Sequence, residues 1–188
     1  MIFSSLCYIE KDEKYLMLHR TKKNNDINEN KWIGIGGKFE VGESPEECII
    51  REVKEETGLT LNSYKFRGII TYISKTWETE YVCLFTSDNF SGKLIECNEG
   101  DLKWIDKKEV LNLKTWEGDK IFINKIQKDD KFFTIKFEYD GDTLLKYDLK
   151  EYWLWVVREW CIKLVENIVY NILTKMAERK IYEYIRNL

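Results

Sequence analysis

The chain has 188 residues and a formal net charge of −3 at pH 7, with 30 Lys and Arg against 33 Asp and Glu. This acidic balance offers no electrostatic attraction for the phosphates of duplex nucleic acid, so we exclude a duplex-binding function. Charged residues make up 34% of the chain and apolar residues 44%, which is typical of a globular protein. The length is enough to bury a core and indicates one domain with an appendage.

The cysteines and the apolar segments indicate a reduced, cytoplasmic protein. Five cysteines lie far apart with no CxxC pair, and His19 is the one histidine, so the sequence predicts neither structural zinc nor a disulfide scaffold. Met1–Ile9 runs directly into charged residues, and we therefore expect no signal peptide. The most apolar late window, Trp153–Leu173, contains four charged side chains, so we expect no transmembrane segment.

Segments rich in β-branched and aromatic residues predict strands in the first part of the chain. After the second of these strands, Thr21–Lys31 is polar and predicts an exposed loop. Ile33–Gly37 is an apolar segment in which the glycines permit a close approach of the backbone. The predicted strands are Phe3–Ile9, Tyr15–His19, Phe66–Ser74, Thr79–Phe85 and Lys103–Ile105.

A helix with clear start and stop signals follows the glycine segment. Ser44 is placed to be the N-cap, Pro45 occupies the first helical position, and Glu47 completes a capping box. Gly58 ends the helix at the position where glycine is favoured. The apolar side of the helix is supplied by Cys48, Ile49, Ile50 and Val53.

Two more helices and a hairpin are predicted downstream. The helices are expected near Lys107–Leu111 and over Asp119–Ile126. Phe132–Tyr139 and Thr143–Tyr147 flank Asp140-Gly141, a strong hairpin signal. Because strands and helices do not alternate regularly, the order predicts an α+β fold and not a doubly wound one.

The composition changes after about Leu149, which predicts a domain over residues 1–149 and a helical extension over residues 150–188. Glu151–Leu188 contains no glycine or proline, and its apolar residues recur at helical spacing. We expect this amphipathic segment to close over the domain or to form a homodimer interface. The alternative is binding at a membrane surface through its three tryptophans, although acidic residues nearly balance its cations.

Four carboxylates gather around one loop and helix: Glu43, Glu52, Glu55 and Glu56. The last three must share a helical face, because residues three and four apart are neighbours on a helix. Such crowding of like charges weakens a helix unless a cation compensates it. Hard oxygen ligands suit Mg²⁺, with Mn²⁺ as a second possibility.

The segment from Gly37 to Leu59 resembles the Nudix box, Gly-x5-Glu-x7-Arg-Glu-U-x-Glu-Glu-x-Gly-U, where U is aliphatic. The resemblance implies a Nudix fold, in which a mixed β-sheet is packed between helices as an α/β/α sandwich. It also implies a Mg²⁺-dependent hydrolase that cleaves a nucleoside diphosphate linked to another group. The defined positions of the box are filled by Gly37, Glu43, Arg51, Glu52, Val53, Glu55, Glu56, Gly58 and Leu59.

The resemblance also implies a role for each polar residue of the box. Glu52 and Glu56 would be the principal metal ligands, and Glu55 would be a further ligand or the base. The carbonyl group of Gly36 would complete the protein's share of the coordination. Arg51 would orient the glutamates by ion pairing, through Glu43 among others.

Beyond the box, Lys31–Lys38 resembles the strand that leads into the box in the MutT-like branch, and Trp116–Asp119 resembles the downstream segment that reads the purine edge there. That branch hydrolyses oxidised purine nucleoside triphosphates such as 8-oxo-dGTP to a monophosphate and pyrophosphate. Trp116 would stack on or wall the base, with plain core packing as the alternative, and Asp119 would hydrogen-bond the edge of the base. Arg20 would meet phosphates or simply be a solvated strand end, and Glu99 would be a late metal ligand or base. The full substrate-binding set implied by the resemblance is Arg20, Ile33, Gly36, Gly37, Lys38, Trp116 and Asp119.

Two departures from that branch leave the substrate open. The chain has Ile33 where sanitising enzymes carry an asparagine, and Gly118-Asp119 where they carry an acid pair. Losing hydrogen-bonding groups from a base pocket changes discrimination strongly. ADP-ribose or another nucleoside-diphosphate compound is therefore the alternative substrate, and a nucleotide-binding module without catalysis is the alternative function.

Overall fold

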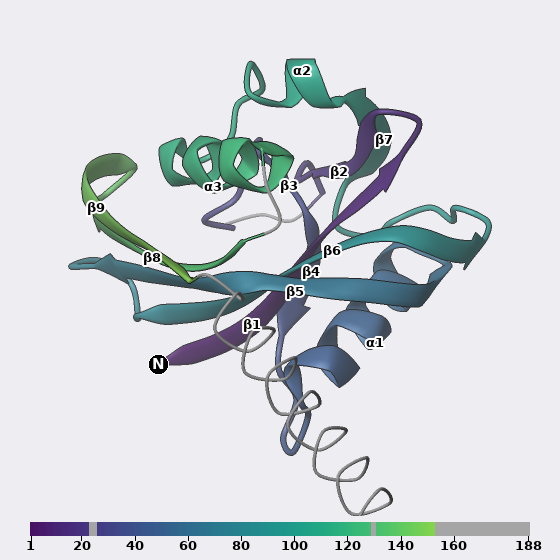
Figure 1. Cartoon of the computed structure of the whole chain (residues 1–188), viewed down its shortest axis with the longest axis horizontal. Coiled ribbons are helices and arrows are strands. Elements are labelled where there is room, and N and C mark those ends of the chain that lie inside the picture. Colours follow the sequence, from purple (N-terminus) through teal and green to yellow (C-terminus); the bar gives the residue numbers. More distant parts are fainter. Residues whose placement is uncertain (23–25, 129–130, 153–188) are drawn as a thin grey trace, which may run out of the picture. The chain divides into compact units, whose positions relative to one another are not determined.

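The structure, a computed structural model, describes residues 1–22, 26–128 and 131–152 (Figure 1). Met1–Glu151 forms one compact unit, which ends two residues beyond the predicted domain boundary. The predicted C-terminal helix and its tryptophans lie outside the described residues. Within those residues, no helix is long and apolar enough to cross a membrane.

A mixed sheet of nine strands organises the described part of the chain. Along the sheet the order is β3-β2-β1-β6-β5-β8-β9, while β4 pairs with β1 and β7 pairs with β2. β1 runs parallel to β6, and β5 runs parallel to β8. The strands are β1 (Ile2–Lys11), β2 (Lys14–His19), β3 (Trp32–Ile33), β4 (Ile35–Lys38), β5 (Leu59–Ser74), β6 (Glu80–Gly92), β7 (Asp101–Asp106), β8 (Phe132–Asp140) and β9 (Thr143–Tyr152).

Helices cover both faces of this sheet, as Figure 1 shows. On one face, α1 (Pro45–Thr57) packs Ile49 and Val53 into a core cluster with residues of β1 and β2. On the other face, α2 (Lys107–Val110) and α3 (Glu117–Lys128) cover a second core cluster that is rich in aromatic residues. The predicted α+β architecture, a mixed sheet between helices, is therefore confirmed.

β5 and β6 extend furthest beyond their predicted bounds. β5 begins at Leu59, directly after α1, and β6 continues to Gly92. The added segments contain Asn62, Ser63 and Asn89, which favour turns when isolated. Here the two strands pair with each other, with Ser63 opposite Asn89, and this long-range pairing overrides the local preference.

The predicted α1 is confirmed together with its caps. The Ser44 hydroxyl accepts a hydrogen bond from the Glu47 amide at 3.2 Å, and the Glu47 carboxylate accepts one from the Ser44 amide at 2.9 Å. Gly58 ends the helix in the left-handed conformation, with φ of 75°. Both ends of the helix are thus fixed by local chemistry, which fixes the register of its acidic side chains.

Replacement of Ser44 by alanine tests the N-cap. We expect Ser44→Ala to lower the free energy of unfolding by about 1 kcal/mol, because the Glu47 amide loses its acceptor. Urea denaturation monitored by circular dichroism measures the change. Ser44→Asp, which keeps an acceptor, is the control and should retain most of the stability. Equal losses in the two variants would contradict the capping role.

Candidate active site

Arg51 is the centre of the polar network on α1. Its Nε and Nη2 atoms donate to the two oxygens of Glu43 at 2.7 and 2.9 Å. Its Nη1 atom donates to Glu52 at 2.8 Å and to the more exposed Glu55 at 3.2 Å. Nη2 also donates to the carbonyl group of Lys38 at 3.1 Å. One guanidinium group therefore ties three box carboxylates to the end of β4.

The charge of Arg51 changes the acidity of its main partner. Its hydrogen bonds to Glu43, helped by the amide of Glu40, lower the pKa of Glu43 to about 2. Glu43 is therefore ionised at any physiological pH and forms a fork-to-fork pair with the guanidinium. The ion pair expected between Arg51 and Glu43 is present, and its role in orienting the metal-binding glutamates stays a prediction.

Glu56, the fourth carboxylate, and Glu52 lie against the glycines of β4. The Gly36 amide donates to Glu56 at 3.0 Å, and only 7% of Glu56 is exposed. A Cβ atom on Gly37 would lie 2.3 Å from a carboxylate oxygen of Glu52, so a side chain there would displace that group. A Cβ atom on Gly36 would lie 2.0 Å from the carbonyl oxygen of Ser5 on β1. The glycine pair thus lets β4 lie between β1 and the acidic face of α1.

The arrangement fits a divalent cation by the chemistry of its donors. No three His, Cys, Asp or Glu side chains within the described residues converge as a preformed cluster. Glu52 and Glu56 nevertheless hold two largely buried carboxylates beside the same backbone segment. Mg²⁺ usually takes one or two carboxylates and keeps several waters, so this sparse oxygen set suits it.

Arg20 and Glu99 lie together. The Arg20 guanidinium is buried, and it pairs with Asp26, with 2.7 Å from Nε to Oδ2, and with Glu99. The structure therefore places Arg20 against carboxylates. Its predicted contact with phosphate and the predicted metal role of Glu99 both stay predictions.

The structure also brings Trp116 and Asp119 together. Asp119 is buried and accepts a hydrogen bond from the Tyr72 hydroxyl at 2.9 Å, while the Trp116 ring packs edge-on against Tyr139 with 5.3 Å between centroids. The Tyr139 hydroxyl in turn accepts from the Gly118 amide at 2.8 Å. We call these four side chains, Tyr72, Trp116, Asp119 and Tyr139, the Trp116 cluster.

Lys31 belongs to this region, and the prediction that the whole of Thr21–Lys31 is exposed was wrong. The side chain of Lys31 is buried, and its Nζ atom lies 3.9 Å from the centroid of the Trp116 ring and 3.7 Å from Asp142. Asn28 accepts a hydrogen bond from the Trp116 ring nitrogen at 2.8 Å. The polar composition concealed this because lysine and asparagine can pack on an aromatic face while keeping their polar ends bonded.

Ile33 and Lys38 lie apart from the Trp116 cluster. Ile33 packs against the core beneath α1, whereas its neighbour Trp32 packs against the core beneath α3. Lys38 is exposed at the end of β4, where its carbonyl group binds Arg51. Their predicted contacts with substrate stay predictions.

Sequence reasoning missed Tyr72, Tyr139, Asn28 and Lys31. Tyr72 and Asp119 are 47 residues apart, and Trp116 and Asn28 are 88 apart, so no short motif joins them. For Tyr72 and Tyr139, the sequence showed only that each is an aromatic residue within a predicted strand.

Comparison with known proteins identifies the family. A model of the NUDIX domain matches residues 3–126. An uncharacterised Nudix hydrolase of Bacillus subtilis is 30% identical over 149 residues, covering 76% of this chain and 90% of that protein. The chain therefore belongs to the Nudix family, whose members hydrolyse phosphoric anhydride bonds of nucleotides and generally use divalent metal ions.

Two further comparisons concern the MutT-like branch. An oxidised purine nucleoside triphosphate hydrolase of Danio rerio is 30% identical over 132 residues, covering 69% of this chain and 83% of that protein. The crystal structure of a MutT protein from Bacillus halodurans superposes with a TM-score of 0.72 at 28% identity, covering 80% of this chain and 98% of that one. The predicted similarity to this branch is confirmed.

A double-mutant cycle tests the Arg51 network. We expect Arg51→Lys to lower hydrolytic activity by roughly 10–100-fold and to raise the metal concentration needed, because lysine cannot bind Glu43 with a fork. Glu43→Gln should lose activity for the same reason. The double variant should be little worse than either single one when nucleotide hydrolysis is followed during a metal titration. Additive losses would show that the two side chains act separately.

The acidity of Asp119 gives a test by pH. Burial raises the pKa of Asp119 from 3.8 to about 7, against opposing effects of the Tyr72 hydroxyl and Lys31. Between pH 4 and 7 the Asp119 carboxyl keeps its proton in the folded protein but has lost it in the unfolded chain. The contribution of Asp119 to the free energy of unfolding therefore falls as pH rises from about 4 to 7. We expect Asp119→Asn to remove this slope from the free energy of unfolding measured in urea. An unchanged slope would contradict the buried, protonated carboxyl.

Proposed function

We propose that this protein is a Mg²⁺-dependent pyrophosphohydrolase of nucleoside triphosphates, with oxidised purines such as 8-oxo-dGTP as leading substrates. The products would be a nucleoside monophosphate and pyrophosphate. The network of Arg51 with Glu43, Glu52 and Glu55, beside Glu56 on Gly36, is the observation that supports catalysis most directly. We expect the enzyme to act in the cytoplasm.

In this proposal Glu52 and Glu56 hold the metal ion together with the carbonyl group of Gly36. A bound Mg²⁺ ion would neutralise phosphate oxygens and make a water easier to deprotonate. Glu55 has 60% of its side chain exposed and only one long bond to Arg51, so it is the carboxylate best able to accept a proton from water. Mn²⁺ can replace Mg²⁺ because it takes the same oxygen ligands.

The Trp116 cluster supports a purine substrate. In this proposal Trp116, which is 9% exposed and has Lys31 over its ring, walls the base and does not stack on it. The buried Asp119 has a carboxyl group whose pKa of about 7 lets it either donate or accept a hydrogen bond near neutral pH. The Danio rerio relative is, by its name, an oxidised purine nucleoside triphosphate hydrolase, and the Bacillus halodurans protein is named a MutT protein.

ADP-ribose or another nucleoside-diphosphate compound is the second candidate substrate. The observation that favours it is Ile33, which packs beneath α1 and supplies no hydrogen bond to a base. A module that binds nucleotides without cleaving them is less well supported, because all four box glutamates are present with their bracing arginine.

A nucleotide panel tests the proposal. We expect Mg²⁺-dependent release of monophosphate and pyrophosphate from 8-oxo-dGTP, at a higher kcat/KM than from dGTP or ADP-ribose, with products identified by chromatography. Glu56→Gln should lower kcat on the order of 10²-fold through the loss of about 2.7 kcal/mol of metal-dependent stabilisation.

The control for this variant is Glu46→Gln, which removes an acid of the first turn of α1 at a position that the box leaves undefined. It should keep activity close to that of the original chain. A strong preference for ADP-ribose would overturn the choice of substrate, while full turnover by Glu56→Gln would overturn the mechanism.

A further inference from the structure

Trp116 is held by a short segment that directly precedes β3. We call residues 26–31 the Asn28 segment. The Trp116 ring nitrogen donates to the side-chain oxygen of Asn28 at 2.8 Å, which fixes the edge of the indole. The Lys31 ammonium group lies 3.9 Å from the centroid of the same ring and covers one face. The Asn28 segment therefore contacts Trp116 at both its edge and its face.

The Asn28 segment has a defined conformation of its own. The Glu29 amide donates to the Asp26 carbonyl group at 2.9 Å, and the Lys31 amide donates to the Asn28 carbonyl group at 2.9 Å. Bonds of this spacing close two successive turns. The Asn28 side chain thus accepts its hydrogen bond from a fixed position.

An ion pair anchors the start of the Asn28 segment to the end of β2. Arg20, which follows β2 directly, is 7% exposed and donates from Nε to one oxygen of Asp26 at 2.7 Å. The other oxygen of Asp26 accepts from the Asn28 amide at 3.1 Å. Charge-assisted bonds of this kind are stronger than neutral ones. A continuous series of bonds therefore runs from the buried Arg20 through Asp26 and Asn28 to Trp116.

The position of Trp116 also affects Asp119. The Asp119 amide donates to the Trp116 carbonyl group at 3.0 Å, where α3 begins. In the proposed function Trp116 walls the purine and Asp119 bonds its edge, so one backbone bond joins the two groups that meet the base. Discrimination between similar ligands depends on the shape of such a pocket and on its hydrogen bonds.

We propose that Asn28 is a positioning residue that determines base specificity, because it holds the Trp116 ring in the orientation that fits a purine. The inference rests on the proposed function, since it takes the purine to lie against Trp116. Asn28 acts through Trp116 and not by contact with the substrate. A purely structural Asn28 would only stabilise its own segment, and its loss would not change which purine is bound.

Calorimetric titration of the full chain with 8-oxo-dGMP, dGMP and AMP, in the presence of a metal chelator, separates these two roles without turnover. Asn28→Leu keeps the size of the side chain and removes the acceptor. We expect it to weaken the tightest-binding purine by roughly tenfold and to reduce the preference for that purine by about fivefold. Asn28→Asp keeps an acceptor, so its affinity should stay within about threefold of the original and its preference should be retained.

The hydrolysis assay adds a second measurement. Asn28→Leu should raise KM and leave kcat within about twofold of the original, because Asn28 contributes to binding of the base and not to the chemical step. If Asn28→Leu fails to fold, Asn28→Ala, which only truncates the side chain, takes its place in both experiments.

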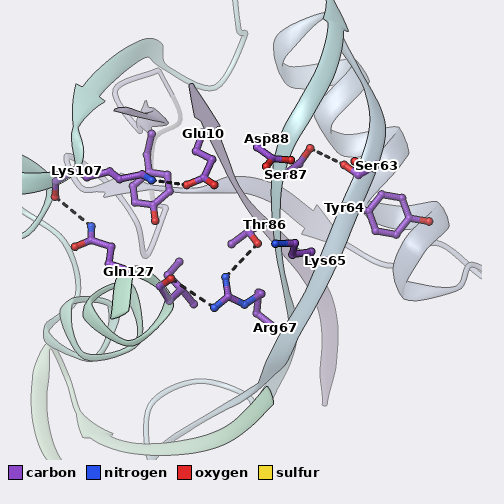
Figure 2. A pocket seen from close by; sticks show the side chains of 12 residues that line it. Glu10, Ser63, Tyr64, Lys65, Arg67, Thr86, Ser87, Asp88, Lys107 and Gln127 are labelled. Carbon is purple, nitrogen blue, oxygen red and sulfur yellow. Dashed lines mark hydrogen bonds and ion pairs between the residues drawn. The ribbon is translucent and has the colours of Figure 1, made fainter. Parts of the chain in front are cut away.

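Gln127→Leu is the matched control, because it also removes a side-chain amide that joins two elements. Gln127 on α3 donates to the Lys107 carbonyl group at 3.1 Å, beside a polar cavity that no residue of the Asn28 segment lines (Figure 2). Its purine affinity should stay within about twofold of the original.

Four results would overturn the inference: no saturable binding of any of the three purines, an unchanged preference in Asn28→Leu, equal weakening by Gln127→Leu, or equal loss in Asn28→Asp. Failure of the proposed function is a different result. If the original chain binds a purine monophosphate but hydrolyses no nucleotide, the proposed function is wrong, and the affinities of the Asn28 variants still decide the inference.

Discussion

The ion pair between Arg51 and Glu43 is the interaction on which the rest of the site depends. Three carboxylates on one face of α1 repel one another, and the guanidinium group offsets this by contacting two of them as well as Glu43. The same group binds the carbonyl of Lys38, so the electrostatic compensation also fixes the helix to β4. The guanidinium group of Arg51 therefore both balances the charge of the helix and places its glutamates beside Gly36 and Gly37.

The helix of the site could be predicted from the sequence because its determinants are local. Ser44, Glu47 and Gly58 act within a few residues of the helix ends, and the spacing of the glutamates follows from helical geometry. The positions of most strands along the chain were also predictable, although their order within the sheet was not. The hairpin was predictable too, although its turn is formed by Gly141 and Asp142, one residue later than expected.

The surroundings of the site could not be predicted, because they depend on pairs that are distant in sequence. The bond between Tyr72 and Asp119 and the contact of Lys31 with Trp116 each require the finished sheet. The burial of Arg67 depends on a bulge that appears only when β5 is aligned with β6. Polar residues are predicted to be exposed from their composition alone. The few that are buried can be identified only from their contacts in the folded structure.

The position of β1 in the sheet has a consequence for the order in which the protein assembles. β1 is made first, and its neighbours β2 and β4 follow within 40 residues, but its parallel neighbour β6 begins only at Glu80. During synthesis β4, which carries the glycine pair, can therefore pair with one edge of β1 well before β6 covers the other edge. Closing the parallel pair is a non-local, slow step, and until it occurs the central strand of the enzyme is an open edge.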